Sequence, residues 1–244
     1  MLTENLTRVR RRMEQACARC GRDPSSVTLI GVTKGVPPSR IREAVALGVT
    51  DLGENRVQEA RDKQDALHDL NVRWHLIGHL QRNKAKDAVE RFSVVQSVDS
   101  VALVEELQRQ AEKRQRSVSV LVHVNVSGEA TKFGCRPEEV QVIAQAIQNS
   151  SSLKLLGLMT IAPFSENPED ARPHFRRLRQ LRDDIHLKFF NSSFFTHHSS
   201  LLLSMGMSGD FEVAIEEGAD CVRVGTAIFG TRDVGHGGWE SKND

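Results

Sequence analysis

The sequence predicts a single (β/α)8 barrel of the TIM type with an extra N-terminal helix, and three observations support this. Short apolar runs alternate with longer amphipathic stretches eight times along the 244 residues. Such alternation indicates parallel strands joined by helical crossovers, and eight units suit a barrel of roughly 250 residues. A doubly wound open sheet would carry a glycine-rich phosphate loop after its first strand, and Thr33-Lys34-Gly35 is not one.

The predicted elements follow this alternation along the chain. Residues 3–19 form a helix ahead of the first strand. Short apolar runs predict strands at 27–33, 51–53, 74–78, 94–97, 119–125, 155–159, 202–205 and 221–224. Every strand except the last precedes a stretch with apolar residues at helical spacing, for example 39–47, 56–67, 101–114, 137–148, 171–185 and 211–217. We therefore expect one domain over residues 1–230.

Two segments fit the barrel less well. Residues 188–203, KFFNSSFFTHHSSLLL, hold four of the ten phenylalanines around a centre rich in Ser, Asn and His. A frayed helix end, a surface loop and a partner-binding patch all remain open for them. The tail 231–244, TRDVGHGGWESKND, is polar and glycine-rich, so we expect it to be disordered.

Composition narrows the function classes. A net charge of +1 gives no reason to expect nucleic acid or an anionic membrane as partner. No stretch approaches the roughly 18 apolar residues of a spanning helix, and the N-terminus lacks the apolar core of a secretory signal. Cys17-Ala-Arg-Cys20 lacks the second ligand pair of a zinc site and is interpreted as two small residues on a helix. We expect a cytoplasmic protein with reduced thiols.

Polar residues at the carboxyl ends of the strands are the candidates for a site, because barrel chemistry is placed there. Lys34 follows the first strand, and Glu54-Asn55-Arg56 follows the second. The third strand contains His75, which alternation places among apolar neighbours, so we interpret it as a satisfied core histidine. His79 lies just beyond that strand.

The last two strands predict a phosphate site. Ser208-Gly209-Asp210 precedes a helix after the seventh strand, and Gly225-Thr226 follows the eighth. These loops commonly bind phosphate in barrels through backbone amides, and the hydroxyls of Ser208 and Thr226 add donors. The alternative is that both glycines serve only as turn residues.

Arg223 lies inside an apolar strand, where an unpaired charge is costly. Alternation places it on the face opposite Val222 and Val224, inside the barrel. It is either the partner of Glu54 or Asp51 in a core salt bridge, or a donor aimed at a bound ring.

Lys34 would then lie at the site after the first strand, which is the neighbour of the eighth strand in a closed barrel. An amine partly desolvated near a guanidinium takes the neutral, nucleophilic form more readily. A lysine with a phosphate pocket suggests an aldehyde-bearing phosphate held as a Schiff base. Pyridoxal 5′-phosphate (PLP) has both the aldehyde and the phosphate. An aldolase-like sugar-phosphate enzyme and an ordinary surface lysine stay open.

Longer motifs add a resemblance. VTK ending at Lys34, LGENRVQE (52–59), WHLIGHLQRNK (74–84), GLMTI (157–161), LSMGMSGD (203–210) and VRVGTAIFG (222–230) resemble the pyridoxal phosphate homeostasis proteins. These are single-domain proteins related to the barrel of alanine racemase, and the resemblance runs from about residue 3 to 230. The chain departs from it at 188–203, where the family usually has a shorter connection.

The resemblance implies individual roles. Lys34 matches the lysine that forms the internal aldimine with PLP, and Asn55 the residue near the ring hydroxyl. Arg223 matches the arginine at the pyridine nitrogen; being always protonated, it leaves the ring unprotonated and a poor electron sink. The residues that match the phosphate site are Ser208, Gly209, Gly225 and Thr226.

Two functions remain open. A carrier would store PLP and deliver it to apo-enzymes, as a monomer or weak dimer and without turnover of its own. A PLP-dependent amino-acid racemase would need a second base opposite Lys34. In the related alanine racemase this base is a tyrosine from a second domain, and the present sequence contains no tyrosine. His75 or His79 could be proposed instead. We favour the carrier, with the 188–203 segment as a possible partner-binding patch.

Overall fold

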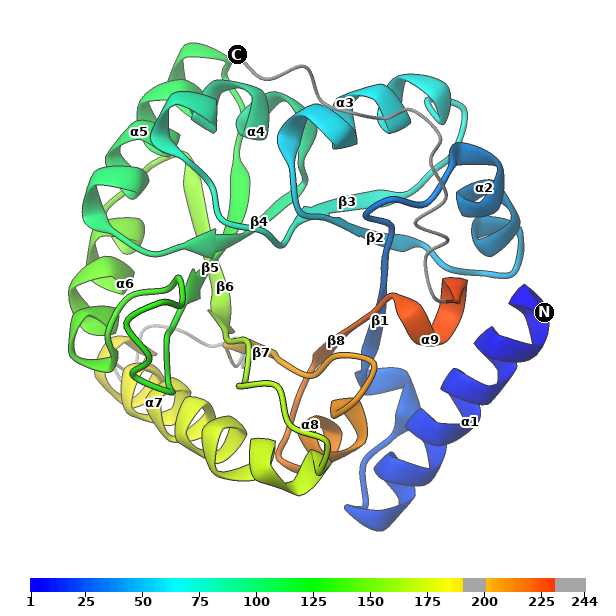
Figure 1. The fold of residues 1–244 in the computed structure, drawn as a ribbon. Coiled ribbons are helices and arrows are strands. Elements are labelled where there is room, and N and C mark those ends of the chain that lie inside the picture. The colour runs from blue at the N-terminus through cyan, green and yellow to red at the C-terminus, as the bar shows by residue number, and fades with distance from the viewer. Residues whose placement is uncertain (191–200, 231–244) are drawn as a thin grey trace.

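The computed structural model describes residues 1–190 and 201–230, and these form one closed barrel of parallel strands (Figure 1). Strands β1 and β8 pair in parallel with Ile30 opposite Arg223, so the sheet has no open edge. The predicted fold class is confirmed. The strands are β1 (Thr28–Val32), β2 (Asp51–Glu54), β3 (Arg73–Leu76), β4 (Val94–Val98), β5 (Val118–His123), β6 (Leu153–Met159), β7 (Leu202–Ser204) and β8 (Cys221–Val224).

Helices surround the barrel and bury their apolar faces against it (Figure 1). Phe92, Phe175 and Phe211 are the largest side chains sealed between the two layers. The helices are α1 (Leu2–Arg19), α2 (Pro38–Ala46), α3 (Val57–Ala66), α4 (Ala85–Arg91), α5 (Val101–Lys113), α6 (Val140–Gln148), α7 (Arg172–Phe190), α8 (Phe211–Glu216) and α9 (Thr226–Phe229).

The N-terminal helix α1 covers the outside of the last β/α unit, where it lies beside α8 and α9 (Figure 1). Its apolar residues at helical spacing, among them Leu6, Val9 and Met13, are buried. At its rim Arg12 pairs with Glu212 at 2.6 Å. The extra helix therefore stabilises the part of the barrel that carries the last two loops.

Two helix predictions need correction, one a boundary and the other a missed helix. The stretch predicted as one helix from 137 begins as a 3-10 turn, Pro137–Glu139, before α6 starts at Val140. No helix was expected after the eighth strand, yet the four-residue α9 lies there. A single turn is too short to show a periodic apolar pattern, which explains the miss. The predictions for the centre of 188–203 and for the tail fall on residues 191–200 and 231–244, outside the described residues.

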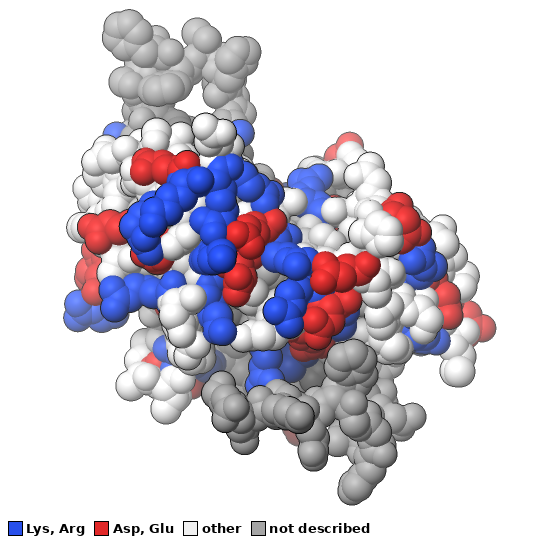
Figure 2. Space-filling model, turned by 90° about the horizontal axis from the view of Figure 1, so that it is seen from above, with Lys and Arg blue, Asp and Glu red and all other residues white. Residues whose placement is uncertain are grey.

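The surface carries charges of both signs close together. Figure 2 shows Lys and Arg among Asp and Glu over one side of the molecule. Many of them pair, as Arg114 does with Glu90 at 2.7 Å. Of the helices in the described ranges, none has both the length and the apolar character needed to cross a bilayer.

Cys17 and Cys20 lie at the C-terminal end of α1. Cys17 is buried in α1 and Cys20 follows its end, and all four cysteines are free. Within residues 1–190 and 201–230, no cluster of His, Cys, Asp and Glu could hold a metal ion. The interpretation as a helix residue is confirmed for Cys17, whereas Cys20 is the C-cap of α1.

Candidate functional site

A cavity of about 720 Å³ opens at the carboxyl ends of the strands. Lys34 reaches it from the end of β1, Asn55 from β2, His79 from beyond β3 and His123 from β5. The strand-end rule thus brings Lys34 and Asn55 into one space, as the sequence predicted. The cavity also meets the cation Lys84 on its rim.

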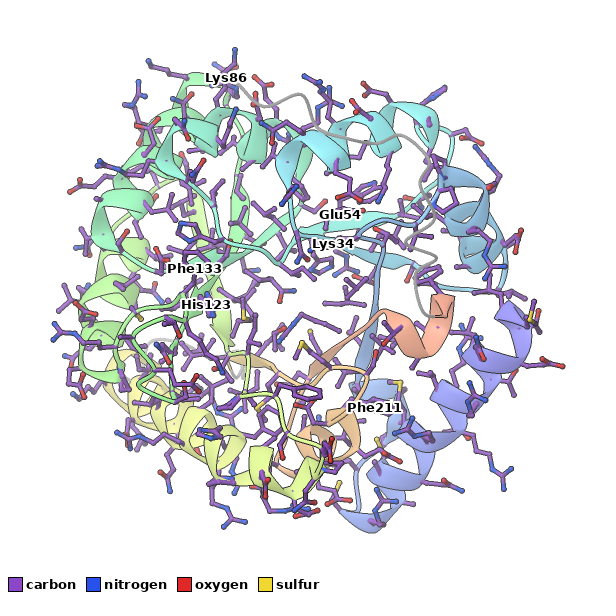
Figure 3. The ribbon with its side chains drawn as sticks, viewed as in Figure 1. Lys34, Glu54, Lys86, His123, Phe133 and Phe211 are labelled. Atoms are coloured by element: carbon purple, nitrogen blue, oxygen red, sulfur yellow. The ribbon has the colours of Figure 1, made fainter. Side chains whose placement is uncertain are left out.

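The loop that carries Lys34 is fixed on both sides of that residue. The Thr33 hydroxyl donates to Glu54 Oε1 at 2.5 Å, and the Gly35 amide donates to Glu59 at 2.5 Å. Gly35 has φ +69°, a left-handed conformation that favours glycine. Figure 3 shows Lys34 and Glu54 together at the ends of their strands. Within the described residues the Lys34 amine itself has no hydrogen bond or ion pair.

A second lysine completes this support. Lys63 of α3 is buried, and its Nζ donates to the Thr33 carbonyl (2.5 Å), to Glu54 (2.7 Å) and to Glu59 (2.7 Å). Burial raises the pKa of the fully buried Glu54, and Lys63 and Thr33 oppose that rise. Because Lys63 makes these three contacts, it is not available to the cavity, whereas the half-buried Lys34 lines it together with Lys84 and Lys132.

Arg223 lies inside the barrel, 3% exposed, as alternation predicted. Its Nη1 donates to Ser204 Oγ and its Nη2 to the Thr160 carbonyl, both at 2.7 Å. Burial lowers the pKa of Arg223 to about 10, against the attraction of Asp210. Both acceptors are neutral, so the guanidinium charge is not cancelled at either contact.

The core salt bridge considered for Arg223 is not formed. Glu54 pairs with Lys63, whereas Asp51 lies 2.9 Å from His75 and 3.3 Å from Arg73. No carboxylate of the described residues lies within ion-pair distance of Arg223. The sequence could not separate the two interpretations because alternation gives the face of a residue and not its partner.

The two predicted phosphate loops meet. Ser208 Oγ accepts hydrogen bonds from the amides of Gly225 and Ala227, both at 3.3 Å, which ties the loop after β7 to the start of α9. A Cβ on Gly225 would lie 3.3 Å from the Val32 carbonyl, so this turn packs against the end of β1. A Cβ on Gly209 would meet nothing within 4 Å.

These loops offer unused donors. Within the described part of the chain, the backbone amides of Ser208, Gly209 and Thr226 donate to no acceptor. Free amides in adjoining turns are the kind of donor that backbone anion sites use. Thr226 is the first residue of α9. The sequence analysis predicted no helix there, so it did not predict that the Thr226 amide lies at a helix start.

The two histidines of the third strand region differ in role. His75 is buried, with Nε2 2.9 Å from Asp51 and Nδ1 3.0 Å from Gln96, so its interpretation as a core histidine is confirmed. His79 stacks on Phe133 with ring centroids 4.1 Å apart and an interplanar angle of 12°. Phe133 comes from the loop after β5 and covers part of the cavity.

His123 was missed by sequence reasoning. It ends β5, which lies opposite β1 in an eight-stranded barrel, and both His123 and Lys34 line the cavity (Figure 3). It is 5% exposed, and its Nδ1 has no partner within the described residues. Burial lowers the pKa of His123 to about 4, and Arg223 and His79 add to this. Ending the predicted strand at 123 instead of 125 would have revealed it.

Comparisons with known proteins show which family the chain belongs to. The family "Alanine racemase, N-terminal domain" matches residues 4–233. The pyridoxal phosphate homeostasis protein of Aquifex aeolicus (strain VF5) is 46% identical over 94% of this chain and 97% of its own length. That of Pseudomonas aeruginosa is 42% identical over 96% and 97%. PipY of Synechococcus elongatus PCC7942, solved with PLP bound, is 35% identical with a TM-score of 0.80, covering 94% of this chain and 100% of PipY.

Proposed function

We propose that this chain, which belongs to the family of the pyridoxal phosphate homeostasis proteins, holds PLP as a Schiff base on Lys34 and releases it intact to apo-enzymes. The observation that carries the proposal is the unpaired Lys34 amine at the cavity, together with two adjoining loops that have unused amides and pack against Val32 at the end of β1. The name of the relatives and the PLP-bound PipY support the choice of ligand. Residues 1–230 would form the binding unit.

The phosphate of PLP fits the two adjoining loops. The amides of Ser208, Gly209 and Thr226 would donate to its oxygens, and the open space at Gly209 leaves room for close approach. A side chain at Gly225 would press on Val32. Ser208 orders both loops through its two accepted bonds.

The pyridine ring fits Arg223 and Asn55. Arg223 keeps a full positive charge because it contacts only neutral acceptors, so it would donate to the ring nitrogen and leave it unprotonated. Asn55 would lie near the ring hydroxyl. When bound, PLP supplies an electrophilic aldehyde and an electron-accepting ring, and an unprotonated ring accepts electrons poorly. This arrangement favours holding the cofactor over using it.

A racemase-like enzyme remains the second candidate, and one observation favours it. His123 lies across the cavity from Lys34 with an unpartnered Nδ1, in the neutral form that a base requires. The relatives are named as homeostasis proteins, and the sequence has no tyrosine to act as the second base. We therefore retain the carrier as the proposal.

The proposal also covers the recipients of PLP, the cellular compartment and the oligomeric state. The recipients would be apo-enzymes that require PLP, and the carrier would act in the cytoplasm, where its four free cysteines stay reduced. It would act as a monomer or weak dimer.

Titration with PLP, followed by visible absorption, tests the proposal. We expect wild type to take up one equivalent with a Schiff-base band, and Lys34→Ala to lose that band and bind at least about tenfold more weakly. Lys84→Ala is the matched control, because Lys84 lines the same cavity and should leave the band intact. An equal loss in both variants would remove the special role of Lys34. Turnover of amino acids by the loaded wild type would favour the enzyme.

A further inference from the structure

Five polar side chains from five strands connect across the barrel interior, where barrels of this type carry mainly bulky apolar residues. None is more than 5% exposed. They are Asp51 of β2, His75 of β3, Gln96 of β4, Ser204 of β7 and Arg223 of β8. Each is hydrogen-bonded to the next, so a single polar chain joins the Asp51 carboxylate to the Arg223 guanidinium.

The chemistry of the guanidinium sets the direction of every bond. Arg223 can only donate, so Ser204 Oγ accepts from Nη1 at 2.7 Å and gives its own proton to Gln96 Oε1 at 2.6 Å. The Gln96 amide nitrogen then faces His75 and donates to Nδ1 at 3.0 Å. The His75 proton must therefore sit on Nε2, which donates to Asp51 Oδ1 at 2.9 Å.

The reverse direction is disfavoured. If the Gln96 amide were turned over, Ser204 Oγ would accept from both Gln96 and Arg223, and its own proton would have no acceptor within the described residues. An unsatisfied buried hydroxyl is costly. At the far end, burial would raise the pKa of Asp51, but the His75 bond and the nearby Arg73 hold it below its ordinary value. Asp51 is thus the anionic end of a chain that runs one way.

Arg223 depends on this chain for its orientation. Its described contacts are Ser204 Oγ and the Thr160 carbonyl, and Ser204 is itself oriented by Gln96. Because Gln96 and Ser204 are neutral, they hold the guanidinium without cancelling its charge. A carboxylate in either place would cancel it.

We propose that Asp51, His75, Gln96 and Ser204 form a one-way hydrogen-bond relay that positions Arg223, with Gln96 and Ser204 as the positioning residues. The inference rests on the proposed function only in assigning Arg223 to the ring of PLP. The direction of the relay and the tautomer of His75 stand independently of any ligand.

The ligand-free half is tested by nitrogen-15 NMR of the full chain labelled at histidine, with His75 assigned by the signals lost in His75→Gln. We expect a protonated Nε2 and an unprotonated Nδ1 in wild type. In Gln96→Glu the carboxylate can only accept, so both ring nitrogens should become protonated. A protonated Nδ1 in wild type would overturn the direction. If Gln96→Glu fails to fold, the wild-type shifts alone decide it.

The positioning half is tested by the spectrum and release rate of bound PLP. Ser204→Ala should shift the absorption maximum and speed release about tenfold, whereas Ser204→Thr keeps the hydroxyl and should restore both. Ser97→Ala is the matched control, since the buried Ser97 Oγ has no partner in the described residues. A wild-type spectrum for Ser204→Ala, with loading on Lys34 intact, would refute the relay and spare the proposed function. Failure of wild type to bind PLP would overturn the proposed function and the positioning role at the ring, while the direction of the relay is decided by the histidine shifts alone.

Discussion

At the scale of single residues, burial decides which polar groups face the cavity ready to act. Lys34 keeps a free amine because Lys63 takes the neighbouring carboxylates, Glu54 and Glu59. His123 stays neutral because it is buried beside the cation Arg223. The two groups therefore face one cavity with no competing partner among the described residues.

His123 makes stability depend on pH. Its pKa is about 4 when folded and about 6.5 when unfolded, so between these values the unfolded chain binds the proton more readily. Its contribution is present above pH 6.5 and is lost as the pH falls towards 4. We expect wild type to lose about 2 kcal/mol of unfolding free energy from this source between pH 7 and pH 5. Urea unfolding at pH 7 and pH 5 measures this change. In His123→Leu the unfolding free energy should fall between the two pH values by about 2 kcal/mol less than in wild type.

The control for this experiment is His68→Gln, because His68 is exposed and should leave the pH dependence unchanged. Equal pH dependence in wild type and His123→Leu would show that His123 titrates normally when folded.

At the scale of elements, β1, β2 and α3 meet in the buried contacts of Lys63, which fix the loop before α2. The carboxylates of Glu54 and Glu59 come from β2 and α3, while the Thr33 carbonyl comes from the end of β1. This arrangement stabilises the Lys34 loop without using Lys34.

The buried cation Lys63 should contribute to the stability of the fold. Lys63→Met leaves Glu54 buried without a cation, so we expect a loss of about 3 kcal/mol of unfolding free energy, together with weaker retention of PLP. Urea unfolding measures the first and dialysis of the loaded protein the second. Lys86→Met is the control, since Lys86 is exposed on the outer helix layer (Figure 3). A loss below about 0.5 kcal/mol in Lys63→Met would mean that the cluster is not stabilising.

The elements also show how far sequence reasoning reaches. Apolar periodicity predicted all eight strands and the longer helices within a few residues, because burial on one or both faces imposes that pattern. The strand-end rule correctly brought Lys34 and Asn55 to one cavity and the loops after β7 and β8 together, while the binding of PLP by these residues stays a prediction. The one-turn α9 was missed because it has no period to detect.

What the sequence could not supply is which side chains meet across the barrel. Gln96 and Ser204 are 108 residues apart, yet they are 2.6 Å apart in the fold. No local pattern predicts such a pair. The partner of Arg223 and the alignment of His123 with Lys34 depend in the same way on closure of the barrel.

At the scale of the whole molecule, a closed barrel sets the site on one rim and leaves its interior for the polar relay. The loops after β1, β2, β7 and β8 meet because closure makes β8 a neighbour of β1. We predict that this one barrel suffices to hold PLP reversibly through Lys34.

Attachment of PLP to Lys34 can be tested by borohydride reduction of the PLP-loaded protein, followed by peptide mapping by mass spectrometry. Reduction makes the bond to the amine permanent, so we expect one pyridoxyl phosphate group per chain, on the peptide that contains Lys34. A modification spread over several lysines, or found on Lys84 or Lys132 of the same cavity instead, would contradict it.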